Sequence, residues 1–528
     1  MPVYGVIDVG SNAIKLKVAR CEAPGRVETL LDEREPVRMG AGVFRGKPIS
    51  RETVRAAADA ISRFRKLFES QNVEQFRAVA TSAMREAPNR HSVIEEIRER
   101  CGIELEVISG SEEARLIQVG TSLDVNATRG NVLFIDIGGG SCELSVRENG
   151  ELKELCSLAL GAVRLTENFI RSDPISADDH RKLKDYIYSE LRNNVGSMAR
   201  RSYELAIGTA GTINAICESI LAQREVYASS TPSAVRYAAV SSLHRRLREM
   251  KLEARKDLPA MSGNRADIIV AGAAVLKYVL KMFKLPSIRP SKRGLRDGVL
   301  LDLLLRHARD RKLEREFHRS RREGLVHFGD RFAVPRAHTE HVTKLALDLF
   351  DQLAELHKLG DEERGLLEAS GLLHEVGRAV NYGSMHKHSY YIIKNAELTG
   401  FTQDEIGIIA NIARYHRRNE PSMKHENFSA LSPRQRIVVR WLSGILRVAD
   451  GLDRHHDARV RAVKARVDSR VITLDLDNEY ESELEIWSSR RKSRVLAEVS
   501  ERKLEYREKH APEKKVHQDS GTAALKSA

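Results

Sequence analysis

The sequence predicts a duplicated α/β domain of two similar lobes, followed by a mainly helical region and a small C-terminal sheet. Two runs of apolar, strand-forming residues, Val3 to Ile7 and Val132 to Ile135, each lead into an Asp and a Gly-rich turn. Strand and helix patterns alternate after each of these runs. From residue 330 to residue 460, by contrast, apolar residues recur mainly at helical spacing.

The two Gly-rich turns indicate one anion-binding device used twice. Their sequences are Asp8-Val9-Gly10-Ser11-Asn12 and Asp136-Ile137-Gly138-Gly139-Gly140-Ser141. Such a turn exposes successive backbone N–H groups, and glycine lets an anion approach the main chain without a Cβ in the way. The Asp at the end of each strand supplies a carboxylate suited to Mg²⁺. The repeat therefore predicts phosphate held between two lobes, and phosphoryl chemistry.

The first lobe is expected over residues 1–125 and the second over residues 126–305. Ser50 begins a helix as its N-cap, since a side-chain oxygen there accepts a bond from a free backbone N–H. The segment Gly208-Thr209-Ala210-Gly211-Thr212 follows a further apolar strand and is a third phosphate-type turn, because it opens a helix. The expected helices span 50–70, 92–101, 176–200 and 267–283, and the expected strands span 76–80, 105–108, 142–146 and 205–207.

The second half is expected to hold a helical domain over 306–459 and a small α+β subdomain over 460–515. Residues 306–325 are highly charged, which indicates an exposed connecting helix or linker. Residues 516–528 are polar and small, as is typical of a disordered tail. The expected helices are 339–356, 361–373, 389–395, 403–414 and 433–452, and the expected strands are 460–467, 471–476 and 483–486.

The composition fits a globular chain with polyanionic partners. Of 528 residues, 41% are hydrophobic and 30% are charged, which suits several packed domains. The net charge of +13 favours nucleic acid, an anionic membrane or inorganic polyphosphate, whereas an aromatic content of 5% disfavours stacking of single-stranded bases. No apolar run is long enough to span a bilayer, and no signal-peptide pattern begins the chain. The five cysteines form no C-x-x-C pair, so a cytoplasmic location is expected, with a redox-sensitive Cys142 as the alternative to a structural one.

Five motifs in order carry a family resemblance. They are the two Gly-rich turns, the third turn at Gly208, and the segments Ala80-Thr81-Ser82-Ala83-Met84-Arg85 and Ser109-Gly110-Ser111-Glu112-Glu113-Ala114-Arg115. Together they resemble the exopolyphosphatase/guanosine pentaphosphate phosphohydrolase family over nearly the whole chain. The resemblance implies an actin-like (ASKHA) duplicated α/β domain that binds substrate between its lobes, followed by an α-helical HD-like domain.

The resemblance also implies roles for single residues. Glu113 falls where the family has its general base, and Glu112 beside it is expected to face solvent or to pair with Arg115. Asp136 and Glu143 resemble the family's ligands for Mg²⁺ or another divalent cation, and Asp8 is a further candidate for holding a metal or a water. The phosphate-binding residues would be Gly10, Ser11, Asn12, Thr81, Ser82, Arg85, Gly138, Gly139, Gly140, Ser141, Gly208, Ala210, Gly211 and Thr212.

Each of these roles has a structural alternative. Without the resemblance, Glu113 would be an ordinary carboxylate at the start of a helix. Glu143 would pair across its hairpin, Asp8 would stabilise its turn, and Arg85 would form a surface ion pair.

The helical half contains His341, His374-Glu375, His416 and Asp450 in the order of an HD-type metal phosphohydrolase. An active site of that type needs His and Asp side by side, and Glu375 stands in the place of the Asp. The resemblance therefore implies a structural domain rather than a metal site. Basic residues in this half are expected to guide a polyanion toward the cleft, or to form a solvated face; they are Lys387, His388, Arg414, Arg417, Arg418 and Arg454.

The favoured function is an exopolyphosphatase that releases terminal orthophosphate through a water activated by Glu113, with Mg²⁺ assisting. The alternative within the family is a 5′-phosphohydrolase of guanosine pentaphosphate. A phosphotransferase from polyphosphate to a nucleotide and a regulatory module that binds nucleotides or nucleic acid without turnover remain open. The expected partners are inorganic polyphosphate, guanosine penta- or tetraphosphate and a second copy of the chain, with neither a membrane nor a specific nucleic acid.

Overall fold

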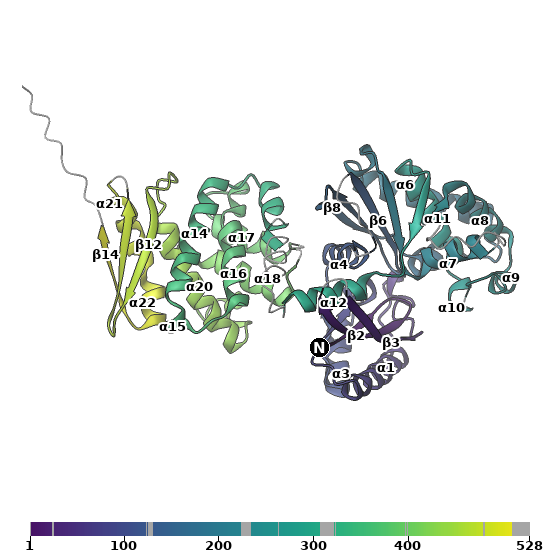
Figure 1. The fold of residues 1–528 in the computed structure, drawn as a ribbon, viewed down its shortest axis with the longest axis horizontal. Helices are drawn as coiled ribbons and strands as arrows, with labels where there is room; N and C mark the ends of the chain where they lie inside the picture. The colour runs from purple at the N-terminus through teal and green to yellow at the C-terminus, as the bar shows by residue number, and fades with distance from the viewer. Residues whose placement is uncertain are drawn as a thin grey trace, which may run out of the picture. The chain divides into compact units, whose positions relative to one another are not determined.

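The computed structural model describes residues 2–23, 26–122, 124, 130–222, 234–261, 263–306, 321–322, 324–396, 398, 400–478 and 481–508 (Figure 1). The chain divides into unit 1, residues 1–320 with 399–403, and unit 2, residues 321–398 with 404–528. The predicted linker at 306–325 and the predicted tail at 516–528 lie almost wholly outside the described residues. Within the described parts of the chain, no helix is both long enough and apolar enough to cross a bilayer.

Unit 1 is built on two sheets in which the strands follow the same order and directions. In the first lobe the order is β3-β2-β1-β4-β5, with β1–β3 antiparallel and β4 and β5 parallel to β1. In the second lobe the order β8-β7-β6-β9-β11 repeats this arrangement, and β10 extends it. The strands are β1 Val3–Val9, β2 Ile14–Ala23, β3 Arg26–Glu35, β4 Gln75–Ala80, β5 Glu106–Val107, β6 Asn131–Ile137, β7 Cys142–Glu148, β8 Glu151–Leu158, β9 Leu205–Thr209, β10 Val235–Arg236 and β11 Ser287–Pro290. The predicted duplication of the α/β domain is therefore confirmed.

The first long helix of unit 1, α1 Arg51–Ser70, begins where local chemistry predicts. Ser50 Oγ accepts a bond from Thr53 N at 3.1 Å at the start of α1, because the first backbone N–H groups of a helix have no partner within it. The short helices are η1 Val43–Arg45, α2 Ser82–Glu86, η2 Met198–Arg200, α9 Leu252–Lys256 and α10 Gly263–Ala266. The longer ones are α1 Arg51–Ser70, α3 Arg90–Cys101, α4 Gly110–Ser122, α5 Ala162–Phe169, α6 Ala177–Asn194, α7 Ala210–Ala222, α8 Tyr237–Glu249, α11 Ile269–Met282 and α12 Leu295–Arg306.

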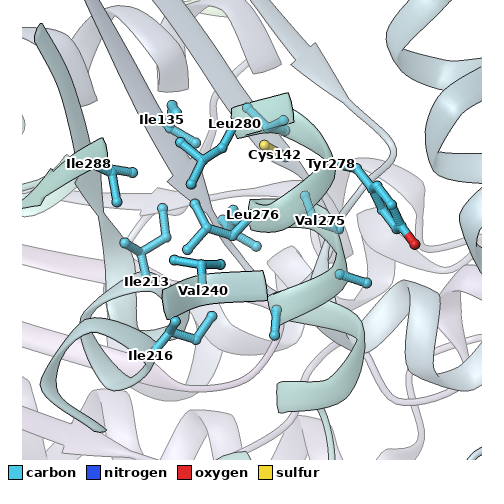
Figure 2. Close-up of a cluster of buried hydrophobic side chains, with 14 of the residues drawn as sticks. Ile135, Cys142, Ile213, Ile216, Val240, Val275, Leu276, Tyr278, Leu280 and Ile288 are labelled. Atoms are coloured by element: carbon cyan, nitrogen blue, oxygen red, sulfur yellow. The ribbon is translucent and has the colours of Figure 1, made fainter. Parts of the chain in front are cut away.

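Apolar helix α11 fills the core of the second lobe. Figure 2 shows Leu276 and Leu280 of α11 packed with Ile135 of β6 and with Cys142 at the start of β7. The Cys142 side chain is fully buried, and burial raises the pKa of its thiol well above the ordinary value. A buried, protonated thiol is a poor redox sensor, so the structure favours the structural reading of Cys142.

Helix α12 follows the second lobe in sequence but packs on the first. Its residues Val299 and Leu303 share a core with Val6 of β1 and Val79 of β4. It also lies against α4, where a Cβ on Gly298 would come within 1.8 Å of the Leu116 carbonyl oxygen. The absence of a side chain therefore lets the two helices approach closely. Helix α12 was expected to belong to the second lobe, residues 126–305. It belongs instead to the core of the first lobe.

Unit 2 joins a helical layer to a three-stranded sheet of order β12-β13-β14 (Figure 1). Ser432 and Gln435 form a capping box at the start of the long helix α20. The short helices are α15 Ala354–His357, η3 Val376–Ala379 and α19 Glu426–Ser429. The longer ones are α14 Arg336–Gln352, α16 Asp361–Leu373, α17 Met385–Lys394, α18 Gln403–Tyr415, α20 Pro433–Gly451, α21 Glu483–Lys492 and α22 Arg494–Ser500. The strands are β12 Val460–Val467, β13 Val471–Asn478 and β14 Lys503–Glu508.

The predicted strand at 483–486 is wrong, because this segment is the first turn of helix α21. Alternating apolar and acidic residues over four positions favour a strand, but the helix packs against α20 so closely that a Cβ on Gly451 would lie 2.4 Å from Ser489 Cα. The third strand is β14, which runs parallel to β13. Tertiary packing thus overrides a short period-two pattern.

Replacing Gly298 by Ala should destabilise unit 1. The new methyl group would meet backbone rather than a movable side chain, so α4 and α12 would have to separate, and we expect a loss of about 1–3 kcal/mol. Urea unfolding followed by circular dichroism measures this change. Gly196→Ala is the matched control, because no atom lies within 4 Å of its Cβ position, and a change within about 0.5 kcal/mol is expected there. Equal effects of the two substitutions would contradict the close approach.

Candidate functional site

The two Gly-rich turns have the same backbone structure. Gly10 N donates to Ala13 O at 3.1 Å in the first turn, and Gly138 N donates to Ser141 O at 3.0 Å in the second. Each turn joins two antiparallel strands whose register pairs the strand-end Asp with a residue seven positions later. The duplication therefore extends from the strand order to individual hydrogen bonds.

Both turns line one cavity of about 310 Å³ within unit 1. It lies where the ends of β1 and β6 meet the starts of α2, α4 and α7. Most of the predicted site residues reach it: the lining includes Asp8, Gly10, Ser11, Asn12, Thr81, Ser82, Glu113, Asp136, Gly138, Gly139, Ser141, Ala210, Gly211 and Thr212. Ser11 Oγ and Ser82 Oγ are 2.9 Å apart, which joins the first turn to the start of α2.

Four predicted site residues do not line this cavity. Arg85 and Glu143 contact other side chains of the site instead, as described below. A Cβ on Gly140 would lie 2.2 Å from Ser82 Oγ and 2.3 Å from the Phe44 ring, so this glycine permits close packing beside the cavity. Gly208 is in contact with the core residues Ile213 and Ile288. These two glycines therefore shape the site by packing.

Glu113 lies in the first turn of α4 and is 7% exposed. Its Oε2 accepts a hydrogen bond from Arg85 Nη1 at 2.8 Å, and the same nitrogen donates to Ile108 O at 2.9 Å. Burial raises the pKa of Glu113, and the Arg85 charge opposes this rise. A carboxylate with a raised pKa is suited to accept a proton near neutral pH, and Arg85 holds it in one orientation.

Asp136 and Glu143 face each other across the second hairpin. Burial, with the nearby charge of Glu113, raises the pKa of Asp136 to about 7. Burial also raises the pKa of Glu143 well above its ordinary value. Ser157 Oγ donates to Glu143 Oε1 at 2.7 Å, while the buried Oε2 has no hydrogen-bond partner in the described structure.

These carboxylates fit a hard divalent cation. Repulsion from neighbouring acids of this group, Asp8 among them, helps to raise the pKa values of Glu113, Asp136 and Glu143. Asp8 also forms an ion pair with a side chain of the protein: Lys15 Nζ is 3.4 Å from Asp8 Oδ2. An unpartnered buried carboxylate oxygen and mutually repelling acids are the chemistry expected of a site that binds Mg²⁺ through oxygen.

The third turn stores backbone strain beside the cavity. Ala210 has φ of +68°, in the left-handed region that a residue with a Cβ rarely adopts. At the next position, a Cβ on Gly211 would lie 2.5 Å from Arg265 Nη2. The glycine therefore leaves room for a guanidinium group directly over the start of α7.

Sequence reasoning missed the cationic part of the lining. These residues are Lys15, Arg34, Arg265, Lys292, Arg293 and Arg296. Lys15 pairs with Asp8, as described above. Arg293 Nε is 2.9 Å from Asp124 Oδ1, and Arg296 Nη1 is 2.5 Å from Asp32 Oδ1. Burial and the nearby charge of Arg34 lower the pKa of Arg265, as expected of cations gathered to meet an anion. A residue-by-residue alignment of the two turns would have found Lys15, which occupies the place of Glu143.

Glu112 pairs with Arg115 rather than facing solvent. The two side chains form hydrogen bonds of 2.7 and 2.8 Å, and Glu112 Oε2 also accepts a bond from Gly400 N at 2.7 Å. Arg115 Nη2 reaches Asp302 Oδ1 of α12 at 2.7 Å. The adjacent acids of α4 thus divide their roles, because Glu113 lines the cavity and Glu112 belongs to a buried ion-pair network.

In unit 2 the structure corrects the prediction of which histidine of α14 lies near His374 and Asp450. His341 Nε2 donates to Val460 O at 2.9 Å and does not join His374. His338, one turn earlier on α14, lies with His374 and Asp450 instead. Sequence order alone selected the wrong turn of this helix.

Only some of the predicted basic residues of unit 2 line one cavity. Arg417, Arg418 and Arg454 line a second cavity of about 370 Å³ within this unit. Arg414 stacks over Tyr390 at 5.5 Å. Lys387 and His388, on α17, are not among the residues that line this cavity.

The raised pKa of Asp136 predicts how stability depends on pH. The folded state holds this proton up to a pH of about 7, whereas the ordinary value is 3.8, so the free energy of unfolding falls as pH rises between these values. Thermal melts from pH 5 to pH 8 should show a shallower decline for Asp136→Asn than for the wild type. Mg²⁺ should raise the wild-type melting temperature more at pH 8 than at pH 5.5, because it competes with protons for the carboxylates. Identical pH slopes for the two proteins would contradict the assignment.

Known proteins are similar to this chain in both halves. Curated relatives include the guanosine-5′-triphosphate,3′-diphosphate pyrophosphatases of Photobacterium profundum, 26% identical over 83% of this chain and 85% of the relative, and of Vibrio atlanticus, 26% identical over 93% and 96%. The crystal structure of an exopolyphosphatase from Cytophaga hutchinsonii has 29% identity and a TM-score of 0.54, covering 57% of this chain and 97% of that one. An Aquifex aeolicus Ppx/GppA family member, at 24% identity and a TM-score of 0.50, shares the fold.

Family models match the same two regions. The Ppx/GppA phosphatase family matches residues 18–307, and domain III of the Ppx/GppA phosphatases matches residues 321–490. The first match contains most of the duplicated lobes, and the second contains most of unit 2. The cavity residues that precede the first match are Asp8, Gly10, Ser11, Asn12, Ala13 and Lys15. The chain therefore belongs to the Ppx/GppA phosphatase family.

Proposed function

We propose that this protein releases the terminal phosphate of inorganic polyphosphate by hydrolysis, with Glu113 as the general base. The observation that carries the proposal is the position of Glu113, a buried carboxylate with a raised pKa, in a cavity that turns from both lobes line. A water molecule beside Glu113 would lose its proton to the carboxylate as its oxygen attacks phosphorus. Arg85 orients the base through its 2.8 Å contact.

The turns would bind the phosphate that leaves. Asn12, Gly139 and Gly211 each contribute a backbone N–H group to turns that line the cavity, and such turns suit the oxygens of a phosphoryl group. Because the transition state carries its charge on these oxygens, fixed donors stabilise it more than the ground state. Lys15 and Arg265 add positive charge to the same lining.

Asp8, Asp136 and Glu143 would hold a divalent cation, which neutralises charge on phosphate oxygens when it is bound. These residues supply the acidic oxygens that Mg²⁺ prefers. The Lys15 ammonium group stays near Asp8 and reduces the repulsion among the carboxylates.

The lining of the cavity favours a linear polyanion. It contains the cations Lys15, Arg34, Arg265, Lys292, Arg293 and Arg296, and among its described residues there is no Phe, Tyr or Trp ring on which a base could stack. The second candidate is the 5′-phosphate of guanosine pentaphosphate. It is favoured by the curated relatives, whose names state this activity. The same base and turns would serve either substrate.

Glu113→Gln should abolish turnover without unfolding the protein. The amide keeps the size of the side chain but accepts no proton, so the rate of phosphate release should fall by roughly 10²–10⁴-fold. The matched control is Glu112→Gln, the adjacent buried acid that pairs with Arg115. It should lower the melting temperature and leave most of the rate of the folded enzyme. If Glu113→Gln retained the wild-type rate, the general base would be a different residue.

The substrate is tested by phosphate release with Mg²⁺ from long-chain polyphosphate and from guanosine pentaphosphate under identical conditions. We expect a higher kcat/KM for polyphosphate. A higher value for the nucleotide would select the second candidate. Phosphate release that requires an added nucleoside diphosphate would indicate a phosphotransferase. Binding of both ligands without turnover would reject hydrolysis.

A further inference from the structure

We propose that His338, His374 and Asp450 of unit 2 form a binding site for a divalent transition-metal ion. His338 lies on α14, His374 follows the end of α16, and Asp450 lies near the end of α20. Their ligand atoms all lie within 4.8 Å of one another, and their side chains are buried. Three helices that are far apart in the sequence thus deliver one imidazole or carboxylate each to a single point.

The hydrogen bonds of the histidines orient them as metal ligands. His338 Nδ1 is 2.7 Å from Asp453 Oδ2, and His374 Nδ1 is 2.7 Å from Gly371 O. Because a carboxylate and a carbonyl oxygen only accept, each Nδ1 is the donor, so in the neutral ring that binds a metal the lone pair lies on Nε2. An imidazole fixed in this way by an oxygen acceptor is the usual outer arrangement of a metal-bound histidine.

The inner atoms lack hydrogen-bond partners. Neither His338 Nε2 nor His374 Nε2 has one in the described structure, although His338 is 2% exposed and His374 is fully buried. Buried polar nitrogens in a folded protein are normally paired. Both nitrogens instead face Asp450 Oδ1, at 3.5 Å and 3.8 Å.

These separations suit ligands that share an ion. They are longer than a hydrogen bond, and they are close to the edge of about 3.3–3.6 Å that a tetrahedron of about 2.0–2.2 Å metal bonds would have. The second oxygen of Asp450 forms an ion pair with Lys492. Asp450 therefore offers one oxygen to the ion while Lys492 holds the carboxylate in place.

Further donors and an entry path lie beside the site. Glu375 and His456 form a second group of ligand atoms with His338 within the same 4.8 Å limit, and Glu375 Oε2 is also buried without a hydrogen-bond partner. Asp450, Glu375 and His456 line the cavity of about 370 Å³ in unit 2, through which an ion can enter. Two imidazoles and a carboxylate favour Zn²⁺, Co²⁺, Mn²⁺ or Fe²⁺ over Mg²⁺. The donor set thus differs from the all-oxygen set of unit 1.

The test is Co²⁺ binding to the full chain, stripped with a chelator and then dialysed against Co²⁺ in excess Mg²⁺. Mg²⁺ saturates the carboxylates of unit 1, so roughly one Co²⁺ per chain with nitrogen-ligand absorption bands is expected from unit 2. His374→Gln and Asp450→Asn should each weaken binding by at least the roughly 10–100-fold that follows loss of an outer partner. His341→Gln is the matched control, since His341 is one turn from His338 and bonds to Val460 O; it should bind as the wild type does.

Two further readouts keep the test decisive. Phosphate release by unit 1 and circular dichroism report whether each variant folds. X-ray absorption of the Co²⁺-loaded wild type counts its imidazole ligands without any substitution, and at least two are expected. Absence of Co²⁺ uptake by the wild type, a shell of oxygen ligands only, or unchanged binding in folded His374→Gln would each overturn the proposal.

Discussion

Electrostatic repulsion among buried carboxylates is the constraint to which the rest of unit 1 responds. Asp8, Glu113, Asp136 and Glu143 lie close together and away from water, and this raises the pKa of the last three. Arg85 and Lys15 oppose this effect from fixed positions. Acids with raised pKa values suit a site that binds a divalent cation or accepts a proton from a water molecule. The turns from the two lobes close around it.

Close backbone approach makes this arrangement possible. Helix α12 returns from the second lobe to the core of the first, and Gly298 lets it contact α4, which carries Glu113. The same pair of helices is joined by the buried contact between Arg115 and Asp302. Since breaking a buried ion pair is costly, this contact and the close approach at Gly298 together hold α4 against α12. The position of Glu113 is therefore set by packing against residues that are more than 180 positions away in the sequence.

The carboxylate cluster of unit 1 and the histidine cluster of unit 2 differ in chemistry, but both contain buried polar atoms without a hydrogen-bond partner in the described part of the chain. In unit 1, carboxylates gather beside a cavity that cations also line. In unit 2, imidazole nitrogens of His338 and His374 face one oxygen of Asp450. In both clusters a buried polar atom without a hydrogen-bond partner marks the place where a ligand would complete the structure.

Local signals in the sequence determined much of this protein. Strand-end Asp residues, Gly-rich turns and the cap at Ser50 depend on neighbouring residues, so the lobes, most helices and the acids Asp8 and Asp136 could be predicted from local patterns. The roles expected of Glu113 and Glu143 came from the family resemblance. What depends on contacts between distant segments could not. The cations Arg34 and Arg265 carry no local pattern, the segment at 483–486 became helical through packing on Gly451, and the choice of His338 over His341 was made by which helix face meets α16 and α20. Local chemistry thus specified the elements, and only tertiary structure decided which side chains meet.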